Sequence, residues 1–280
     1  MRLAKRLAVR YIRTKLALLS KVSKRKAAEK AFELFTTPPT REKREVPLIY
    51  LKAESLNFTF NGHKIQGYRW NNPGEKKVLI LHGFESSAVN FYQYIPPLLK
   101  KGYEVLAFDA PAHGRSTGKT INAAEYSMFI QYILKEYGPV TNFITHSFGG
   151  LALSLMLAEV PHDETWKVVF IAPATESTTA MHRFFAFTKL DEDVRKEFQS
   201  LIKEMNGNPL SWYSVARAAD NIRAQVLFFQ DKQDAQTPLR DVEPIIKKGY
   251  SNFRFVITDG LGHRKIYKDA STIKTIMEFL

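Results

Sequence analysis

The chain has 280 residues, no cysteine and a formal net charge of +13 at pH 7. Its length suffices for one large α/β domain or two small ones, and the lack of cysteine excludes disulfides and thiol catalysis. No apolar run reaches the roughly eighteen residues that a membrane-spanning helix needs, so the sequence predicts none.

The basic charge is concentrated at the N-terminus. Residues 1–45 contain 14 Lys and Arg against 4 Asp and Glu, a net charge of +10, which leaves +3 for the other 235 residues. The body of the protein is therefore close to neutral, and we predict no nucleic-acid partner. A basic segment of this kind is typical of a region that binds an acidic partner.

Residues 1–47 are interpreted as a basic amphipathic arm followed by a linker. The first 26 residues predict a helix with an apolar stripe and a basic side. The stripe comprises Leu3, Leu7, Tyr11 and Leu18, widened by Ile12, Leu16 and Leu19, and the basic side comprises Arg2, Arg6, Arg10 and Arg13. Such a helix either lies on anionic lipid or packs its stripe on the protein's own body. Prolines and charges in residues 36–47 predict an extended linker.

A β-hairpin is predicted next. Leu56, Phe58 and Phe60 alternate with polar residues, Asn61-Gly62 provides the two positive-φ positions of a tight turn, and residues 64–70 return.

From Lys77 onward, short apolar runs alternate with helix-length segments. The runs are residues 78–83, 103–110, 141–147, 166–173, 224–231 and 253–260. Apolar strands separated by helices predict a mostly parallel, twisted sheet with helices on both faces. Residues 48–280 are interpreted as this domain, with a small cap inserted at about 174–223. Aromatic residues in 181–187 and 209–216 either line an acyl pocket or form the core of the cap.

Polar and titratable residues follow the apolar runs, where ligands bind in such a sheet. Ser147 follows one run and precedes an apolar helix, and Gly149 and Gly150 allow a sharp turn there. A serine nucleophile needs a base and an orienting acid, and Asp and His residues follow two later runs. At the start of the helix, the N–H of Phe148 is well placed to bind an oxyanion.

This pattern resembles the α/β-hydrolase fold over roughly residues 55–280. The family's nucleophile elbow, G-x-S-x-G, corresponds here to Thr145-His146-Ser147-Phe148-Gly149, with threonine at the first glycine. The segments "HGF" at 82–84 and "DAPAHGRS" at 109–116 resemble the family's oxyanion-hole motif and a structural loop.

The resemblance implies a catalytic triad of Ser147, Asp234 and His263. Asp234 is favoured over Asp231 because Pro238 follows it at the family's spacing, and Gly262-His263 matches the usual G-H. The backbone N–H groups of Phe84 and Phe148 are the implied oxyanion donors.

The predicted function is a serine hydrolase that cleaves a small or lipid-like carboxylic ester, with an apolar acyl or alcohol part, through an acyl-enzyme. The alternatives are a thioesterase, amidase or acyltransferase with the same triad, or a non-catalytic binding protein, which Thr145 favours. The other histidines are expected to be structural: His82 and His113 to bond backbone groups, and His146 to pack beside the elbow.

No cofactor and no metal are predicted, because no histidine pair has zinc-ligand spacing and no glycine-rich phosphate loop occurs. The N-terminal apolar stretch is too short for a secretory signal. We therefore expect a cytoplasmic protein, peripheral at the membrane if the arm binds lipid.

Overall fold

The computed structural model describes residues 3–41 and 45–280, with side chains from Leu7 onward. The chain forms two compact units. The helical unit comprises Met1–Thr37 and Ser177–Tyr213, and the sheet unit comprises Pro38–Glu176 and Ser214–Leu280. The helical unit thus combines the N-terminal segment with part of the predicted cap. The division into an arm and a hydrolase domain with its own cap stays a prediction.

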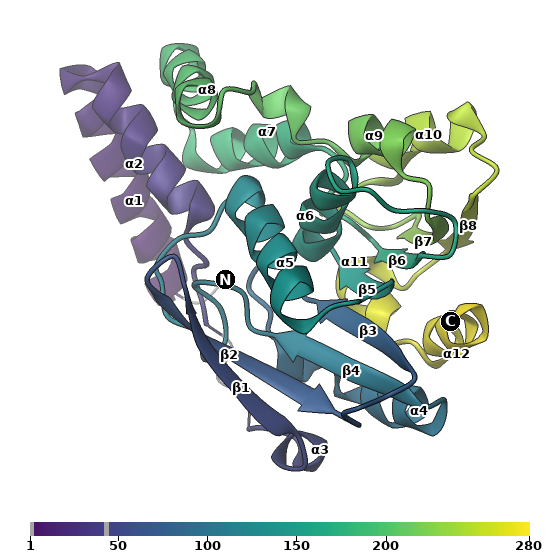
Figure 1. Cartoon of the computed structure of the whole chain (residues 1–280). Coiled ribbons are helices and arrows are strands. Elements are labelled where there is room, and N and C mark those ends of the chain that lie inside the picture. Colours follow the sequence, from purple (N-terminus) through teal and green to yellow (C-terminus); the bar gives the residue numbers. More distant parts are fainter. Residues whose placement is uncertain (1–2, 42–44) are drawn as a thin grey trace. The chain divides into compact units, whose positions relative to one another are not determined.

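In the described residues, the sheet unit is built on eight strands (Figure 1). Their bounds are β1 Glu54–Phe60, β2 His63–Trp70, β3 Lys76–Leu81, β4 Tyr103–Phe108, β5 Asn142–His146, β6 Lys167–Ile171, β7 Gln225–Asp231 and β8 Phe253–Thr258. The strand order is β1-β2-β4-β3-β5-β6-β7-β8. The pairs β1–β2 and β2–β4 are antiparallel, and all other neighbours are parallel. The predicted sheet is confirmed, and each of the six apolar runs overlaps one strand of its parallel part.

The first two strands form the predicted hairpin, in which Phe60 of β1 pairs with His63 of β2. Its turn has φ values of 47° at Asn61 and 77° at Gly62. Both values lie in the left-handed region, which asparagine and glycine tolerate best. The hairpin continues the sheet because β2 also pairs with β4.

Helices cover both faces of this sheet. Their bounds are α3 Leu48–Leu51, η1 Ala88–Tyr94, α4 Ile95–Lys100, α5 Ala123–Tyr137, α6 Phe148–Leu157, α9 Val215–Ala218, η3 Ala219–Asn221, α10 Leu239–Lys248, α11 Gly262–Lys265, η4 Ile266–Lys268 and α12 Ala270–Phe279. Successive strand side chains point to opposite faces. On one face, Val78 and Ile80 join a buried cluster with residues of α3, η1, α4, η4 and α12. On the other, Phe108 of β4 contacts Phe129 of α5, with ring centroids 6.3 Å apart.

The helical unit contains α1 Leu3–Val22, α2 Lys24–Thr36, α7 Ser177–Thr188, α8 Glu192–Asn206 and η2 Leu210–Trp212. The single helix predicted for the first 26 residues is wrong at its C-terminal end. Ser23 adopts φ −157° and ψ 119°, outside the helical range, and its side chain accepts a hydrogen bond from the N–H of Lys26. Serine is a favoured N-cap, so the chain ends one helix there and begins the next.

Aromatic side chains form the core of the helical unit. Phe35 of α2 packs edge-on against Phe184 of α7 and Phe198 of α8, at centroid distances of 5.3 and 5.6 Å. Met181 and Phe185 of α7 are fully buried. Of the two roles left open for the aromatics of residues 181–187, the structure supports the core role for Phe184 and Phe185.

Candidate active site

Ser147 stands at the turn between β5 and α6, with φ 53° and ψ −118°. A positive φ is strained for a serine, and such strain is tolerated where the surrounding structure holds it in place. Here the N–H of Ser147 donates to the carbonyl oxygen of Ile171, and its own carbonyl oxygen accepts from Gly150 and Ala174. These bonds fix the sharp turn that the sequence predicts.

Two glycines permit this turn because other backbone lies very close. A Cβ atom at Gly149 would lie 2.7 Å from the carbonyl oxygens of both Leu81 and His82. A Cβ atom at Gly83, at the end of β3, would lie 2.9 Å from the Cβ of Ser147. Real Cβ atoms do not approach so closely, so larger side chains at either position would push the elbow away from β3.

Thr145 is fully buried in β5 and its hydroxyl donates to the carbonyl oxygen of Val169 at 2.9 Å. The extra volume of threonine is accommodated at Gly150, where a Cβ atom would lie 3.2 Å from the Thr145 hydroxyl and 2.8 Å from Pro173. The hydrogen bond satisfies the buried hydroxyl. The sharp turn at Ser147 therefore forms with threonine at position 145.

The structure brings together the three side chains that the sequence analysis predicts as a triad. The Nε2 atom of His263 lies 3.0 Å from the hydroxyl oxygen of Ser147. The Nδ1 atom of His263 lies 2.8 Å from a carboxylate oxygen of Asp234. The side chain of Asp234 is fully buried, and that of His263 is 8% exposed. In this geometry, Nδ1–H donates to the carboxylate and Nε2 accepts from the serine hydroxyl.

Asp234 is held by its own loop. Its carboxylate accepts hydrogen bonds from the N–H groups of Gln236 and Thr237 and from the Thr237 hydroxyl, at 2.7 to 2.9 Å. Burial alone would raise the pKa of Asp234, but the bond to His263, the charge of His263 and the Thr237 donors lower it below its usual value. The carboxylate is therefore ionised at neutral pH.

Thr237 is a residue that the sequence analysis missed, and its hydroxyl also lies 3.3 Å from the Nδ1 of His263. Its position three residues after Asp234 is a local signal, because aspartate often accepts from backbone two or three residues on. Asp231, the less favoured alternative, makes other contacts. Its carboxylate accepts from the hydroxyl of Thr258 and the N–H of Leu261, which ties β7 to the end of β8.

The two expected oxyanion donors are neighbours. The rings of Phe84 and Phe148 pack edge-on with centroids 5.7 Å apart. Phe148 is the first residue of α6, whose leading N–H groups have no partner within the helix. In the part of the chain that the structure describes, neither N–H is the donor in a loop or turn hydrogen bond. Within the described loops and turns, neither N–H therefore has a backbone acceptor, and their role as oxyanion donors stays a prediction.

His146 packs beside the elbow, as expected, and makes a contact that the sequence did not indicate. Its Nε2 atom lies 3.0 Å from the backbone carbonyl oxygen of His263, and the two rings lie 4.7 Å apart. Burial, followed by the charge of His263, lowers the pKa of His146 to about 3. The ring is neutral, so its single N–H serves as the donor to that carbonyl oxygen.

His82 and His113 bond backbone groups, as the sequence predicts. The Nε2 of His82 accepts from the N–H of Ala110 at 3.0 Å, and its Nδ1 lies 2.8 Å from the carbonyl oxygen of Gly83. The Nε2 of His113 accepts from the N–H of Glu85 at 3.2 Å. Burial is the main cause that lowers the pKa of His82 to about 3 and that of His113 to about 4. Neutral rings in these loops hold the backbone on either side of Phe84.

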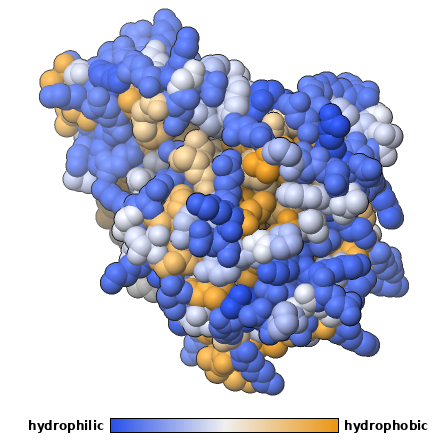
Figure 2. Space-filling view, viewed as in Figure 1, coloured by the Kyte–Doolittle hydropathy of each residue, from blue (hydrophilic) through white to orange (hydrophobic). Residues whose placement is uncertain are grey.

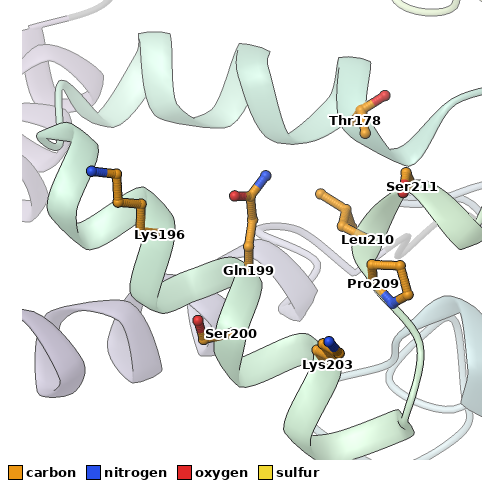
Figure 3. Close-up of a pocket in the computed structure, with 8 residues that line it drawn as sticks. All are labelled: Thr178, Lys196, Gln199, Ser200, Lys203, Pro209, Leu210 and Ser211. Atoms are coloured by element: carbon orange, nitrogen blue, oxygen red, sulfur yellow. The ribbon is translucent and has the colours of Figure 1, made fainter.

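The helical unit has an open pocket of about 390 Å³ (Figure 3). It is lined by Thr178 of α7, by Lys196, Gln199 and Lys203 of α8, and by Leu210 of η2, among others. Pro209, Leu210 and Ser211 of the stretch 209–216 line it, but no aromatic residue of 181–187 or 209–216 does. Most of its lining residues are of polar types, whereas the sequence analysis considered a pocket lined by aromatic side chains.

The described residues include neither a helix able to span a membrane nor a cluster of three or more His, Asp or Glu side chains able to hold a metal ion.

Known proteins share this architecture. A sequence model of the alpha/beta hydrolase fold matches residues 76–207. The structure is similar to that of an esterase from Pyrococcus furiosus, with a TM-score of 0.63 and 23% sequence identity, over 88% of this chain and 97% of the esterase. The protein has the α/β-hydrolase fold.

Two further proteins are similar to this α/β-hydrolase-fold chain. A monoacylglycerol lipase from Paleococcus ferrophilus matches with a TM-score of 0.59 and 21% identity, over 76% of this chain and 97% of the lipase. The uncharacterized hydrolase YugF of Bacillus subtilis is 39% identical over 59 residues. That match covers 21% of each of the two chains, so it relates only a part of them.

Proposed function

We propose that the protein is a serine hydrolase that cleaves a carboxylic ester, with Ser147 as nucleophile, His263 as general base and Asp234 as the orienting acid. The observation that carries the proposal is the continuous chain of two hydrogen bonds, 3.0 and 2.8 Å long, from the serine hydroxyl through the imidazole to a buried carboxylate. A purely structural serine needs no such chain behind its hydroxyl.

The proposed reaction begins when the Ser147 oxygen attacks the ester carbonyl carbon and His263 takes the hydroxyl proton at Nε2. Asp234 keeps the proton of the imidazole on Nδ1 and stabilises the imidazolium that forms. The N–H groups of Phe84 and Phe148 bind the oxyanion of the tetrahedral intermediate. His263 then protonates the leaving alkoxide, and the acyl group remains on Ser147.

Deacylation repeats these steps with water. His263 removes a proton from a water molecule, whose oxygen attacks the acyl carbon, and the protonated imidazole returns the proton to the Ser147 oxygen as the carboxylic acid leaves. Every proton transfer in this scheme uses the Nε2 of His263, which faces the serine hydroxyl.

The ester class is supported by the solved structures that share the fold, because one is named an esterase and another a monoacylglycerol lipase. A substrate with an apolar acyl or alcohol part fits this class. A thioesterase, amidase or acyltransferase would use the same three residues, and no feature of the described site favours one of them. A threonine at position 145 favours a non-catalytic binding protein. Its hydrogen bond to the carbonyl oxygen of Val169 weakens this argument, because the sharp turn forms with the threonine in place.

The test is covalent labelling with a fluorophosphonate probe, followed by hydrolysis of p-nitrophenyl esters of increasing acyl length. The wild-type chain should be labelled, and Ser147→Ala should lose both the label and at least about a thousandfold in kcat/KM. Ser154→Ala is the matched control, because Ser154 lies in the same helix and its hydroxyl bonds only the carbonyl oxygen of Leu151 in the described structure. A folded wild-type protein that resists labelling would overturn the proposal.

A further inference from the structure

The helix α1 has two different apolar faces. One packs within the helical unit: Leu16 and Ser20 are buried, and Ile12 and Leu19 are half-buried. These four residues lie on one side of the helix at a spacing of three or four residues. Ile12, Leu16 and Leu19 supply an apolar contact that attaches α1 to the rest of its unit, and the hydroxyl of Ser20 donates to the carboxylate of Asp191.

The other face carries a stripe of large apolar side chains that are exposed. The exposed fractions are 58% for Leu7, 66% for Tyr11, 59% for Leu18 and 82% for Val22. At 3.6 residues per turn, these four positions fall within about 60° of the helix circumference. The side chain of Leu3, which the sequence places on the same stripe, lies outside the described side chains.

Exposed basic residues border this stripe on both sides. By the same helical geometry, Arg10 and Lys21 lie along one edge and Lys15 lies along the other. No acidic residue occurs before Glu29 in the chain. Figure 2 shows hydrophobic side chains among the hydrophilic surface of the helical unit at the upper left.

We propose that the exposed stripe of α1, which is Leu7, Tyr11, Leu18 and Val22 with its bordering cations, is a docking surface for an anionic lipid membrane. A helix lying in the membrane plane buries an apolar stripe at the boundary of headgroups and acyl chains, and its cations contact the phosphates. Tyrosine suits this boundary because its ring is apolar and its hydroxyl is polar.

The cations beside the stripe favour a membrane over a second copy of the chain or a nucleic acid. A second copy of the same face would bring Arg10, Lys15 and Lys21 close to identical charges, which is unfavourable. A nucleic acid would accept the cations but would leave the four apolar side chains in water. A membrane that is anionic at its headgroups and apolar below them is complementary to both the cations and the apolar side chains.

The proposal is tested by sedimentation of the full chain with vesicles. Vesicles of phosphatidylcholine with about one third phosphatidylserine should retain the protein at low salt, and pure phosphatidylcholine vesicles should retain much less. Raising the salt toward 1 M should release most of the bound protein, because salt screens the lysine and arginine charges. The sedimentation measurement needs no enzymatic turnover, so its result is independent of the proposed hydrolase function.

Two variants separate the charged and apolar components. Lys15→Glu with Lys21→Glu should weaken binding by at least about tenfold. Lys196→Glu with Lys203→Glu makes the same charge change on α8 of the same unit and should reduce binding far less. Tyr11→Ser with Leu18→Ser keeps the charge and should also weaken binding by at least about tenfold, because two apolar side chains no longer enter the bilayer.

Several results would overturn the proposal. These are equal retention by neutral and anionic vesicles, no retention by either, equal weakening by the α1 and α8 charge pairs, or unchanged binding of the Tyr11 and Leu18 variant. Self-association that the Leu18→Ser change abolishes, seen by sedimentation velocity without vesicles, would assign the stripe to a second copy instead. Circular dichroism confirms that each variant retains its helices.

Discussion

The Nε2 atom of His146 lies 3.0 Å from the backbone carbonyl oxygen of His263, the residue whose ring faces Ser147. The side chain of His146 thus binds the main chain of His263. Because α11 comprises only Gly262–Lys265, it has few helical hydrogen bonds of its own to fix the position of His263. We therefore expect His146 to be a positioning residue that acts through the backbone of His263.

We expect His146→Ala to lower kcat for a p-nitrophenyl ester by about tenfold with little change in KM, because misplacing a catalytic group affects the chemical step. His146→Gln carries an amide N–H near the position of Nε2 and should recover most of the activity. The measurement is steady-state kinetics of both variants. Equal losses in the alanine and glutamine variants would contradict the positioning role.

The two neighbouring aspartates should differ in their effect on catalysis. Asp234→Asn should reduce kcat by about 10³- to 10⁴-fold, because an amide no longer holds the productive tautomer of His263. Asp231→Asn should leave kcat within about tenfold, since its carboxylate bonds the Thr258 hydroxyl and the Leu261 N–H and not the imidazole. Kinetics of the two variants, with circular dichroism to confirm folding, check the assignment. A reversed order of the losses would exchange the roles.

Thr145 should contribute to stability more than to catalysis. Thr145→Gly removes a buried side chain and its bond to the carbonyl oxygen of Val169, and we expect the free energy of unfolding to fall by about 2 to 4 kcal/mol. The turnover per folded molecule should stay within about threefold, because Ser147 and Gly149 are retained. Urea unfolding and active-site titration measure the two quantities. A large loss of kcat in a fully folded Thr145→Gly variant would contradict this division.

Three buried neutral histidines should make the fold sensitive to acid. The pKa values of His82 and His146 are lowered to about 3 and that of His113 to about 4, mainly by burial. An unfolded histidine has a pKa of about 6.5, so only the unfolded chain gains these protons as the pH falls below 6.5. Their stabilising contribution is complete above pH 6.5 and is lost toward pH 4.

Asp109 opposes this effect, because burial raises its pKa to about 6 in the folded state. A raised carboxyl pKa makes the folded state more stable as the pH falls from 6 to 4. This gain in the free energy of unfolding offsets the loss caused by about one of the three histidines. We therefore expect the free energy of unfolding in urea to be lower at pH 5 than at pH 7, by on the order of 4 kcal/mol. His146→Gln should show a shallower decline, and parallel pH curves for the variant and wild type would contradict the assignment to His146.

Local patterns predict much of the sheet unit. The runs of apolar residues locate the parallel strands, and Asn61-Gly62 fixes the hairpin, because each signal depends on neighbouring residues alone. The position of the carboxyl ends of the strands then brings Ser147 near the segment that contains His263, which lies 116 residues later. The identity of the acid required the family resemblance, since Asp231 is the last residue of β7 and Asp234 follows three residues later.

Contacts between distant segments account for what the sequence did not predict. The bond from His146 to the carbonyl oxygen of His263 has no signal in either local sequence, because it depends on how α11 approaches β5. Likewise, the pattern of α1 gives two overlapping apolar stripes. Only the packing of α1 decides that Leu16 is buried while Leu18 is exposed.

The helical unit is assembled from segments that are far apart in the chain. Phe35 belongs to the first segment, while Phe184 and Phe198 belong to the second, about 140 residues further on. At a synthesis rate of about 5–20 residues per second, the first two helices leave the ribosome several seconds or more before their aromatic partners exist. During that interval their apolar face is uncovered, so chaperones or a nearby bilayer have time to bind the nascent chain before it closes on itself.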